Sequence, residues 1–151
     1  MSWKATRGNI STMFELSFSV PTEDITPVYR HVHHAQCLRY LETARLRFLE
    51  SIGFPSEAFI AQGLFLVIVN LSITYKRELF QEPLIITCEN FRSRGRELLM
   101  DQRIFKERRK VAVEAVVSSM FMDGTTKRAV SIPQNFATSI SLPPFEVCHG
   151  A

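Results

Sequence analysis

One stretch of helical periodicity, with strand-like segments on both sides, constrains the fold more than any other feature of this sequence. Over residues 34–52, apolar residues recur every three or four positions, and charged residues such as Glu42 and Arg47 fill the positions between them. Gly53 follows directly and is a typical helix stop. The pattern predicts one long helix with an apolar stripe that another element must cover.

The other patterned segments alternate with a period of two, which is typical of strands half buried in a sheet. Before the helix, Phe14, Leu16 and Phe18 alternate with polar residues. After it come four further segments, at residues 64–77, 84–91, 97–106 and 111–122. Four consecutive segments predict an antiparallel meander, with the helix across one face of the sheet. The fold class predicted is therefore α+β.

The chain has 151 residues, 46% of them hydrophobic, which is enough for one domain with its own core. We expect a single domain over residues 1–136 and a weakly patterned C-terminal tail over residues 137–151, with the chain loosely held after Pro133. The longest apolar run is too short to cross a bilayer, and the polar first residues argue against a secretion signal. Three widely spaced cysteines suit a reducing compartment, so we expect a cytoplasmic protein with no membrane partner.

Residues 29–45, which read YRHVHHAQCLRYLETAR, place three histidines at the predicted start of the helix. This segment resembles the helix-entry motif of hotdog-fold acyl-CoA thioesterases of the 4-hydroxybenzoyl-CoA thioesterase type. The family motif reads Asp-x-Asp-x-x-Gly-His-Val-Asn-Asn-Ala-x-Tyr-Leu-x-Tyr-x-Glu-x-Ala-Arg. The matching positions in this chain are His31, Val32, Ala35, Leu38, Tyr40, Glu42, Ala44 and Arg45.

The resemblance implies a hotdog fold, in which an antiparallel sheet wraps around one long central helix. It implies hydrolysis of an acyl thioester to a free acid and a thiol, by a homodimer or homotetramer with active sites between subunits. The exposed sheet edges of such a half-barrel also favour association. The thioester is an acyl-CoA or is carried by an acyl carrier protein. Coenzyme A or phosphopantetheine is then part of the substrate, and no separate cofactor is expected.

The chain departs from the motif at reactive positions, which here are Ile25, Pro27, Arg30, His33 and His34. Ile25 and Pro27 stand where the family has its two aspartates. With a loop one residue longer, Asp24 takes the first acidic position and Thr26 the second. With a loop longer still, Asp24 reaches the catalytic position. The departures leave an alternative open, a hotdog protein that binds an acyl thioester without hydrolysing it.

Thioester hydrolysis needs an activated water and hydrogen-bond donors for the oxyanion that develops on the carbonyl. Backbone N–H groups at the start of the helix can act as those donors. The catalytic candidates are Asp24, His31, His33, Tyr29 and Thr26. A carboxylate or an imidazole can take a proton from water near neutral pH, and the two hydroxyls can position it. The competing structural interpretation is that the aspartate caps a turn and the histidines bond to backbone.

Basic residues gather between residues 92 and 110 in a chain whose net charge is +3. Because arginine forks suit phosphate oxygens, we assign Arg92, Arg94 and Arg96, together with His34, to substrate binding. For residues 106–110 we expect a solvated hairpin. An acidic carrier protein suits the same arginines, and the sequence does not separate the two thiol donors. A nucleic-acid-binding module is a third interpretation, but the aromatic stacking residues that single-strand binders interleave with their charges are reduced here to Phe105, so no nucleic-acid partner is expected.

Three further interpretations concern the helix and its start. The His-x-His-His spacing invites a metal, but no Cys, Asp or Glu at ligand spacing completes a site, so none is expected. Glu42 and Arg45 are three residues apart, and we expect them to form an ion pair. Cys37 lies on the apolar stripe without an evident base, which favours packing over a nucleophilic role.

Overall fold

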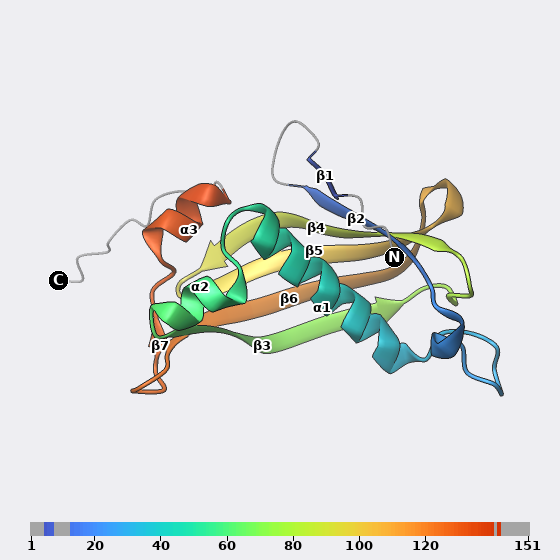
Figure 1. The fold of residues 1–151 in the computed structure, drawn as a ribbon, viewed down its shortest axis with the longest axis horizontal. Coiled ribbons are helices and arrows are strands. Elements are labelled where there is room, and N and C mark those ends of the chain that lie inside the picture. Colours follow the sequence, from blue (N-terminus) through green and yellow to red (C-terminus); the bar gives the residue numbers. More distant parts are fainter. Residues whose placement is uncertain (1–4, 8–12, 141, 143–151) are drawn as a thin grey trace.

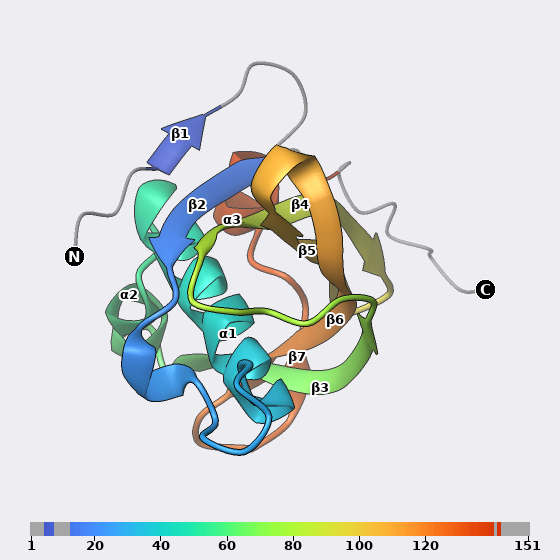
Figure 2. The ribbon, with the colours of Figure 1, turned by 90° about the vertical axis from the view of Figure 1, so that its right-hand side faces the viewer.

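The computed structural model describes residues 5–7, 13–140 and 142 (Figure 1). A long helix, α1 (His34–Ser51), lies across one face of an antiparallel sheet, and the sheet curves around it (Figure 2). The strands are β1 (Ala5–Arg7), β2 (Phe14–Ser19), β3 (Leu64–Tyr75), β4 (Pro83–Arg94), β5 (Glu97–Lys106), β6 (Lys110–Asp123) and β7 (Ala129–Val130). The shorter helical elements are η1 (Thr22–Asp24), α2 (Ser56–Ala61), η2 (Glu107–Arg109) and α3 (Gln134–Ser139). In this described part, every helix is too short or too polar to span a bilayer.

The strands follow the order β1-β2-β4-β5-β6-β3, with β7 paired to β6. The predicted meander is therefore correct for β4, β5 and β6 and wrong for β3, which pairs with β6 instead of β4. In the sequence, α1 follows β2 and precedes β3, and it runs across the face of the sheet (Figure 1). The chain therefore passes from the part of the sheet that contains β2 to the opposite edge, where β3 lies. Alternation along a strand shows which face it buries but not which strand lies next to it.

The core lies between α1 and the concave face of the sheet. The helix buries Cys37, Leu41, Ala44 and Phe48, which form the predicted stripe. It also buries Tyr40 and Leu49, whereas Leu38, predicted to lie beside the stripe, is 39% exposed. On the sheet, Leu16, Ile86, Ile104 and Phe121 are each at most 1% exposed. Burying a side chain of this size contributes roughly 1.5–3 kcal/mol. The helical and strand periodicities of the sequence thus meet in one apolar layer.

The segment after Pro133 is not loosely held where it is described. Residues 134–139 form α3, and Phe136, Ala137, Ile140 and Leu142 are buried. The ring of Phe136 packs edge-on against Phe121, with the ring centroids 5.3 Å apart. The expectation is wrong because a six-residue helix has too few apolar positions to show a period. Residue 141 and residues 143–151 of the expected tail lie outside the described part.

Strand β3 forms an edge of the sheet, with β6 as its one neighbour among the described strands. It is 12 residues long and has a bulge between Ile68 and Asn70. Four large apolar side chains on it remain 42–46% exposed, namely Phe65, Ile68, Val69 and Tyr75. Monomeric sheets usually protect an edge with charges, proline or a short strand. A long apolar edge of this kind is a template for pairing with another strand.

Candidate active site at the start of the long helix

The loop before α1 is folded into a compact turn by its own backbone. Ile25 and Val32 form an isolated bridge, and the N–H and Oγ1 of Thr26 both donate to the carbonyl of His31, at 3.0 and 3.1 Å. Arg30 adopts a φ of 59°, a left-handed conformation that glycine takes without strain. The thioesterase motif that this segment resembles has glycine at this position. Arg30 therefore adopts a backbone geometry that is better suited to glycine.

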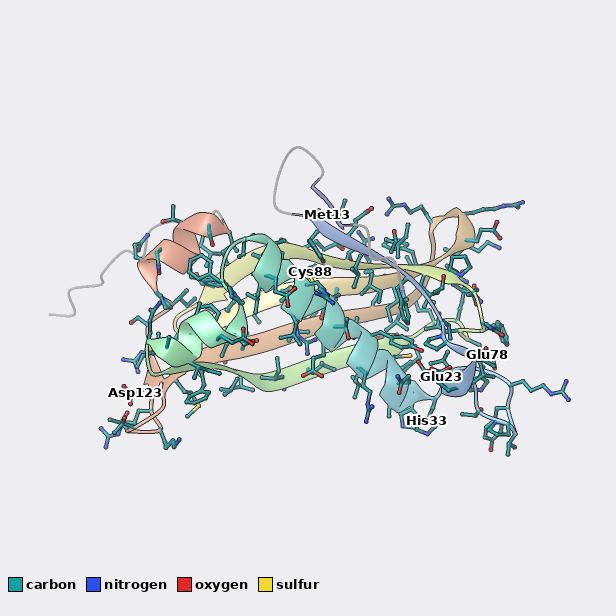
Figure 3. All side chains as sticks on the ribbon, in the orientation of Figure 1. Met13, Glu23, His33, Glu78, Cys88 and Asp123 are labelled. Carbon is teal, nitrogen blue, oxygen red and sulfur yellow. The ribbon has the colours of Figure 1, made fainter. Side chains whose placement is uncertain are left out.

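A groove of about 530 Å³, here called the histidine groove, opens beside the helix start. Its walls are Thr26, Tyr29, His31, Val32, His33, His34, Cys37, Tyr75, Lys76, Arg77, Glu78 and Leu79. Figure 3 shows His33 and Glu78 at this end of α1. The structure therefore brings together the predicted catalytic residues Thr26, Tyr29, His31 and His33 and the predicted substrate-binding residue His34.

His31 has the geometry of a general base. Its Nδ1 lies 2.9 Å from the carbonyl oxygen of Val32. Because a carbonyl can only accept a hydrogen bond, Nδ1 carries the proton and Nε2 keeps its lone pair. That Nε2 lies 3.9 Å from a carboxylate oxygen of Glu78, and the imidazole is 27% exposed. The ring can therefore take a proton from water, and the nearby carboxylate stabilises the cation that results.

His33 and His34 are tied to the end of the helix. His33 is the N-cap, and its Nδ1 accepts the N–H of Ala35 at 3.1 Å, so the structural interpretation is confirmed for this histidine. The carbonyl of His34 accepts the hydroxyl of Tyr75 at 3.1 Å. Within the described residues, the N–H of His34 has no acceptor. It is therefore a free backbone donor at the helix N-terminus, where the helix dipole favours negative charge.

Asp24 lies outside the histidine groove. It ends η1, and its Oδ2 accepts the hydroxyl of Tyr40, a buried residue of α1, at 2.6 Å. Burial and this hydrogen bond raise the pKa of Tyr40 above its ordinary value, so the phenol remains a donor. The carboxylate thus faces the buried side of the helix, and the structure does not bring it to the histidines.

The two hydroxyl candidates differ in their freedom. Thr26 uses its hydroxyl to hold the carbonyl of His31, so its observed contact positions the loop. Tyr29 is 73% exposed, and its ring stacks on His31 with the centroids 5.7 Å apart. Tyr29 is thus the hydroxyl candidate that remains open to a ligand beside the imidazole.

Cys37 lines the groove but is buried in the helix–sheet interface, with 3% of its surface exposed. Burial raises the pKa of its thiol to about 11. At neutral pH the thiol is therefore protonated and a poor nucleophile. The predicted packing role of Cys37 is confirmed by its burial.

Arg92, Arg94 and Arg96 lie at the opposite end of the sheet from the histidine groove. They surround the β4–β5 turn, and β4 separates them from the groove by roughly 35 Å at about 3.3 Å per residue. Arg92 pairs with Asp101 at 3.0 Å, Arg94 pairs with Glu97, and Arg96 donates to a backbone carbonyl at 3.0 Å. These three predicted substrate-binding residues are therefore not brought to the histidine groove of their own chain.

A second cavity, here called the apolar pocket, lies along the C-terminal half of α1 and has a volume of about 250 Å³. Most of its lining is apolar and includes Phe48, Phe59, Phe65, Phe91 and Phe136. Strand β3 contributes four of its first five residues to this pocket, namely Leu64, Phe65, Leu66 and Ile68. The apolar pocket and the histidine groove therefore flank opposite ends of β3.

Glu42 and Arg45 also line the apolar pocket, but the predicted ion pair between them is not formed among the described contacts. Arg45 instead donates from Nη1 to Oε1 of Gln102 at 2.9 Å. Gln102 is fully buried and donates in turn to the carbonyl of Leu41 at 3.0 Å. A buried amide on the sheet competes for the arginine, and helical spacing alone cannot reveal it.

In the part of the chain that the structure describes, no three His, Cys, Asp or Glu side chains converge in a way that would hold a metal ion. The Nδ1 atoms of His31 and His33 are both bonded to backbone groups. The chemistry that this site offers is therefore that of an imidazole base beside a free helix N–H donor.

The sequence has counterparts among known proteins. A family model described as the thioesterase-like superfamily matches residues 20–140. The chain is 30% identical over 110 residues to the long-chain acyl-CoA thioesterase FadM of Escherichia coli strain K12, and the match covers 70% of this chain and 80% of FadM.

Solved structures share the fold. The hypothetical protein SAV2348 of Staphylococcus aureus, solved in complex with CoA, superposes with a TM-score of 0.80 at 22% identity, covering 90% of this chain and 86% of SAV2348. The 1,4-dihydroxy-2-naphthoyl-CoA thioesterase Slr0204 of Synechocystis superposes with a TM-score of 0.79 at 18% identity, covering 86% of this chain and 96% of Slr0204. The overall fold is thus shared with proteins of low sequence identity.

Proposed function

This chain belongs to the thioesterase-like superfamily and has its hotdog fold, and from that premise we propose that it hydrolyses acyl-CoA to a free acid and coenzyme A. The observation that carries the proposal is His31, whose free Nε2 lies in a groove at the start of α1. Within the superfamily, the motif over residues 31–45 supports the 4-hydroxybenzoyl-CoA thioesterase type as the subgroup.

The proposed reaction uses few groups. A water molecule between Nε2 of His31 and the thioester attacks the carbonyl carbon while the imidazole takes a proton. The N–H of His34 donates to the oxyanion of the tetrahedral intermediate, and Glu78 stabilises the imidazolium. The C–S bond then breaks, and the departing thiolate takes the proton from His31. The products are the carboxylic acid and the free thiol.

The free edge of β3 supports a homodimer, or a homotetramer built from it. Two β3 strands that pair antiparallel about their middle place Leu64 of one protomer beside the Tyr75 end of the other. The apolar pocket of one protomer then adjoins the histidine groove of its partner. One chain alone has a polar groove at one end of β3 and an apolar pocket at the other. Pairing supplies both parts of an acyl-thioester site at the same place, with the acyl chain in the apolar pocket.

The β4–β5 turn lies at the Leu64 end of the sheet. The same pairing therefore places this turn at the end of the dimer where the partner's histidine groove lies. Any contact of Arg92, Arg94 or Arg96 with a substrate therefore has to be made in the partner's groove. An acyl carrier protein, as the alternative thiol donor, would meet the dimer along the same rim. Neither donor requires a metal or a separate cofactor.

We also propose a cytoplasmic location. Cys37 and Cys88 are buried free thiols, which is consistent with a reducing compartment.

Thiol release tests this proposal. Purified protein is incubated with short, long and aromatic acyl-CoAs and with one acyl carrier protein thioester, and free thiol is measured over time. We expect turnover of at least one acyl-CoA, with no loss of rate on addition of a chelator. If no donor in the panel releases thiol, hydrolysis is ruled out.

A second candidate function is binding of an acyl thioester without hydrolysis. The observation that favours it is the position of Asp24, which hydrogen-bonds to Tyr40 and leaves the groove without a carboxylate at the family's acidic position. Acyl-CoA binding measured by calorimetry, with no thiol released from the whole panel, would establish this function in place of hydrolysis.

A further inference from the structure

A third depression, here called the cationic groove, adjoins the histidine groove and has a volume of about 280 Å³. It is lined by Arg77, Glu82, Lys106, Glu107, Arg108 and Lys110. Arg77 lines both grooves, so the two depressions are continuous at that side chain. A ligand with its reactive end at His31 can therefore extend past Arg77 into the cationic groove.

The charges in the cationic groove are not all neutralised within the chain. Lys106 pairs with Glu82 at 3.3 Å and donates to a backbone carbonyl at 2.7 Å. Arg77 donates from one guanidinium nitrogen to a carbonyl and meets no carboxylate there. In the described residues, the side chains of Arg108 and Lys110 form no hydrogen bond or ion pair, and of the two acidic side chains in the groove Glu107 alone is equally free. The groove thus retains an excess of free positive charge.

The turn that carries these cations is held in an unusual backbone geometry. Arg108 and Arg109 have φ values of 58° and 57°, a left-handed conformation that is strained for residues other than glycine. Arg109 is fastened to Glu15 by a hydrogen bond of 2.6 Å. With its neighbour anchored, Arg108 extends from a constrained turn. Constrained backbone of this kind is frequent where a protein clamps a ligand.

The arginines at the opposite end of the sheet, around the β4–β5 turn, already have partners within the chain. Arg92 and Arg94 are each paired with a carboxylate, and Arg96 binds a backbone carbonyl. An anion that binds there has to displace existing partners, whereas one in the cationic groove does not. In addition, the cationic groove lies beside the histidine groove of the same chain, at the end of the sheet where β5 and β6 meet.

We propose that the cationic groove is a phosphate subsite that holds the nucleotide phosphates of coenzyme A, with the pantetheine arm passing Arg77 on its way to His31. This inference rests on the proposed function, since it assigns the thiol end of the same substrate. A guanidinium binds phosphate oxygens through a fork and an ammonium acts as a point charge, so Arg77, Arg108 and Lys110 suit adjacent phosphates. A carrier protein has one phosphate and would need a far larger contact surface than this groove offers.

The test compares two substrates on two double variants. Acyl-CoA carries the nucleotide phosphates, and acyl-pantetheine with the same acyl group does not. For R108A/K110A we expect the ratio of kcat/KM for acyl-CoA to kcat/KM for acyl-pantetheine to fall about tenfold or more, with the loss mainly in KM. The matched control is R94A/R96A, which removes the same charge from the other end of the sheet. Its ratio is expected to fall less than that of R108A/K110A.

Three outcomes separate this inference from the proposed function. If R108A/K110A retains the wild-type ratio, or if R94A/R96A loses more, the subsite assignment is overturned while hydrolysis stands. If wild-type protein hydrolyses nothing, calorimetric titration with coenzyme A replaces kinetics. A Kd raised about tenfold in R108A/K110A then supports the subsite although the proposed activity has failed. Equal Kd values for wild type and variant overturn the subsite in that case too.

Discussion

At the scale of single residues, one carbonyl decides which histidine can act as a base. The carbonyl of Val32 fixes the proton of His31 on Nδ1, whereas the Nδ1 of His33 is occupied by the N–H of Ala35. The motif and the helix start were predictable from sequence, and so was the cluster of candidates around them. The distinct roles of the three histidines were not, because they depend on hydrogen bonds that adjacent residues make in three dimensions.

Asp24 and Tyr40 provide a test of structural against catalytic roles. Asp24→Asn should retain most of the hydrolytic rate, since the carboxylate lies outside the groove. It should lower the free energy of unfolding by about 1 kcal/mol, because the amide oxygen still accepts the Tyr40 hydroxyl but lacks the charge that strengthens the bond. Tyr40→Phe removes the hydroxyl itself and should cost more, about 1–3 kcal/mol. Urea denaturation and thiol release measure the two effects. A hundredfold loss of rate in Asp24→Asn, with stability preserved, would instead make Asp24 the base.

The thiol of Cys37 gives a prediction about pH. Since burial raises its pKa to about 11, the thiol stays protonated as the pH rises from 7 to 9 and ionises only near 11. Iodoacetamide at pH 8 should therefore leave the activity intact, and Cys37→Ala should retain the rate within a few-fold. Rapid inactivation at pH 8 that Cys37→Ala abolishes would contradict this assignment. Residual activity after timed alkylation is the measurement.

At the scale of elements, the helix and the strands were predictable because their patterns run over many residues. Helix α1 and strand β5 begin and end within a residue or two of the predicted bounds. The position of β3 at the sheet edge was not predictable, because the alternation of apolar and polar residues does not indicate which strands pair. Nor was the bond between Arg45 and Gln102, which joins helix to sheet across 57 positions of sequence.

Helix α3 is expected to contribute to the stability of the fold through Phe136. Phe136 is fully buried, and its ring contacts the rings of Phe54, Phe59 and Phe121. Phe136→Ala should therefore lower the free energy of unfolding by about 3–5 kcal/mol, the usual cost of removing a buried aromatic ring. The matched control is Thr138→Ala, at an exposed position of α3, which should change stability far less. Equal, small losses in both variants would show that α3 contributes little to the fold.

At the scale of the whole molecule, the proposed acyl-thioester site needs two chains. The apolar pocket and the histidine groove flank opposite ends of β3, and the proposed antiparallel pairing of two β3 strands would bring the pocket of one chain to the groove of the other. Val69→Lys places a charge at the exposed centre of the edge. We expect this variant to elute as a monomer and to lose most of its activity. The control is Val116→Lys, an exposed apolar position on β6, one strand in from that edge and opposite Ser72 of β3.

Sedimentation and thiol release on the two lysine variants decide whether the site is shared. A monomeric Val69→Lys protein that hydrolyses acyl-CoA at the wild-type rate would show that one chain is sufficient. Loss of activity in a variant that remains dimeric would point to damage at β3 itself and not to a missing partner.

The most direct measurement of the central claim is the rate of thiol release by His31→Gln beside that of wild type, on the best acyl-CoA of the panel. Glutamine keeps a polar side chain of similar reach but cannot take a proton from water. Positioned general bases contribute about 10²–10⁴-fold, so we expect kcat to fall by at least a hundredfold while coenzyme A still binds. A His31→Gln protein with a kcat near that of wild type would contradict the account.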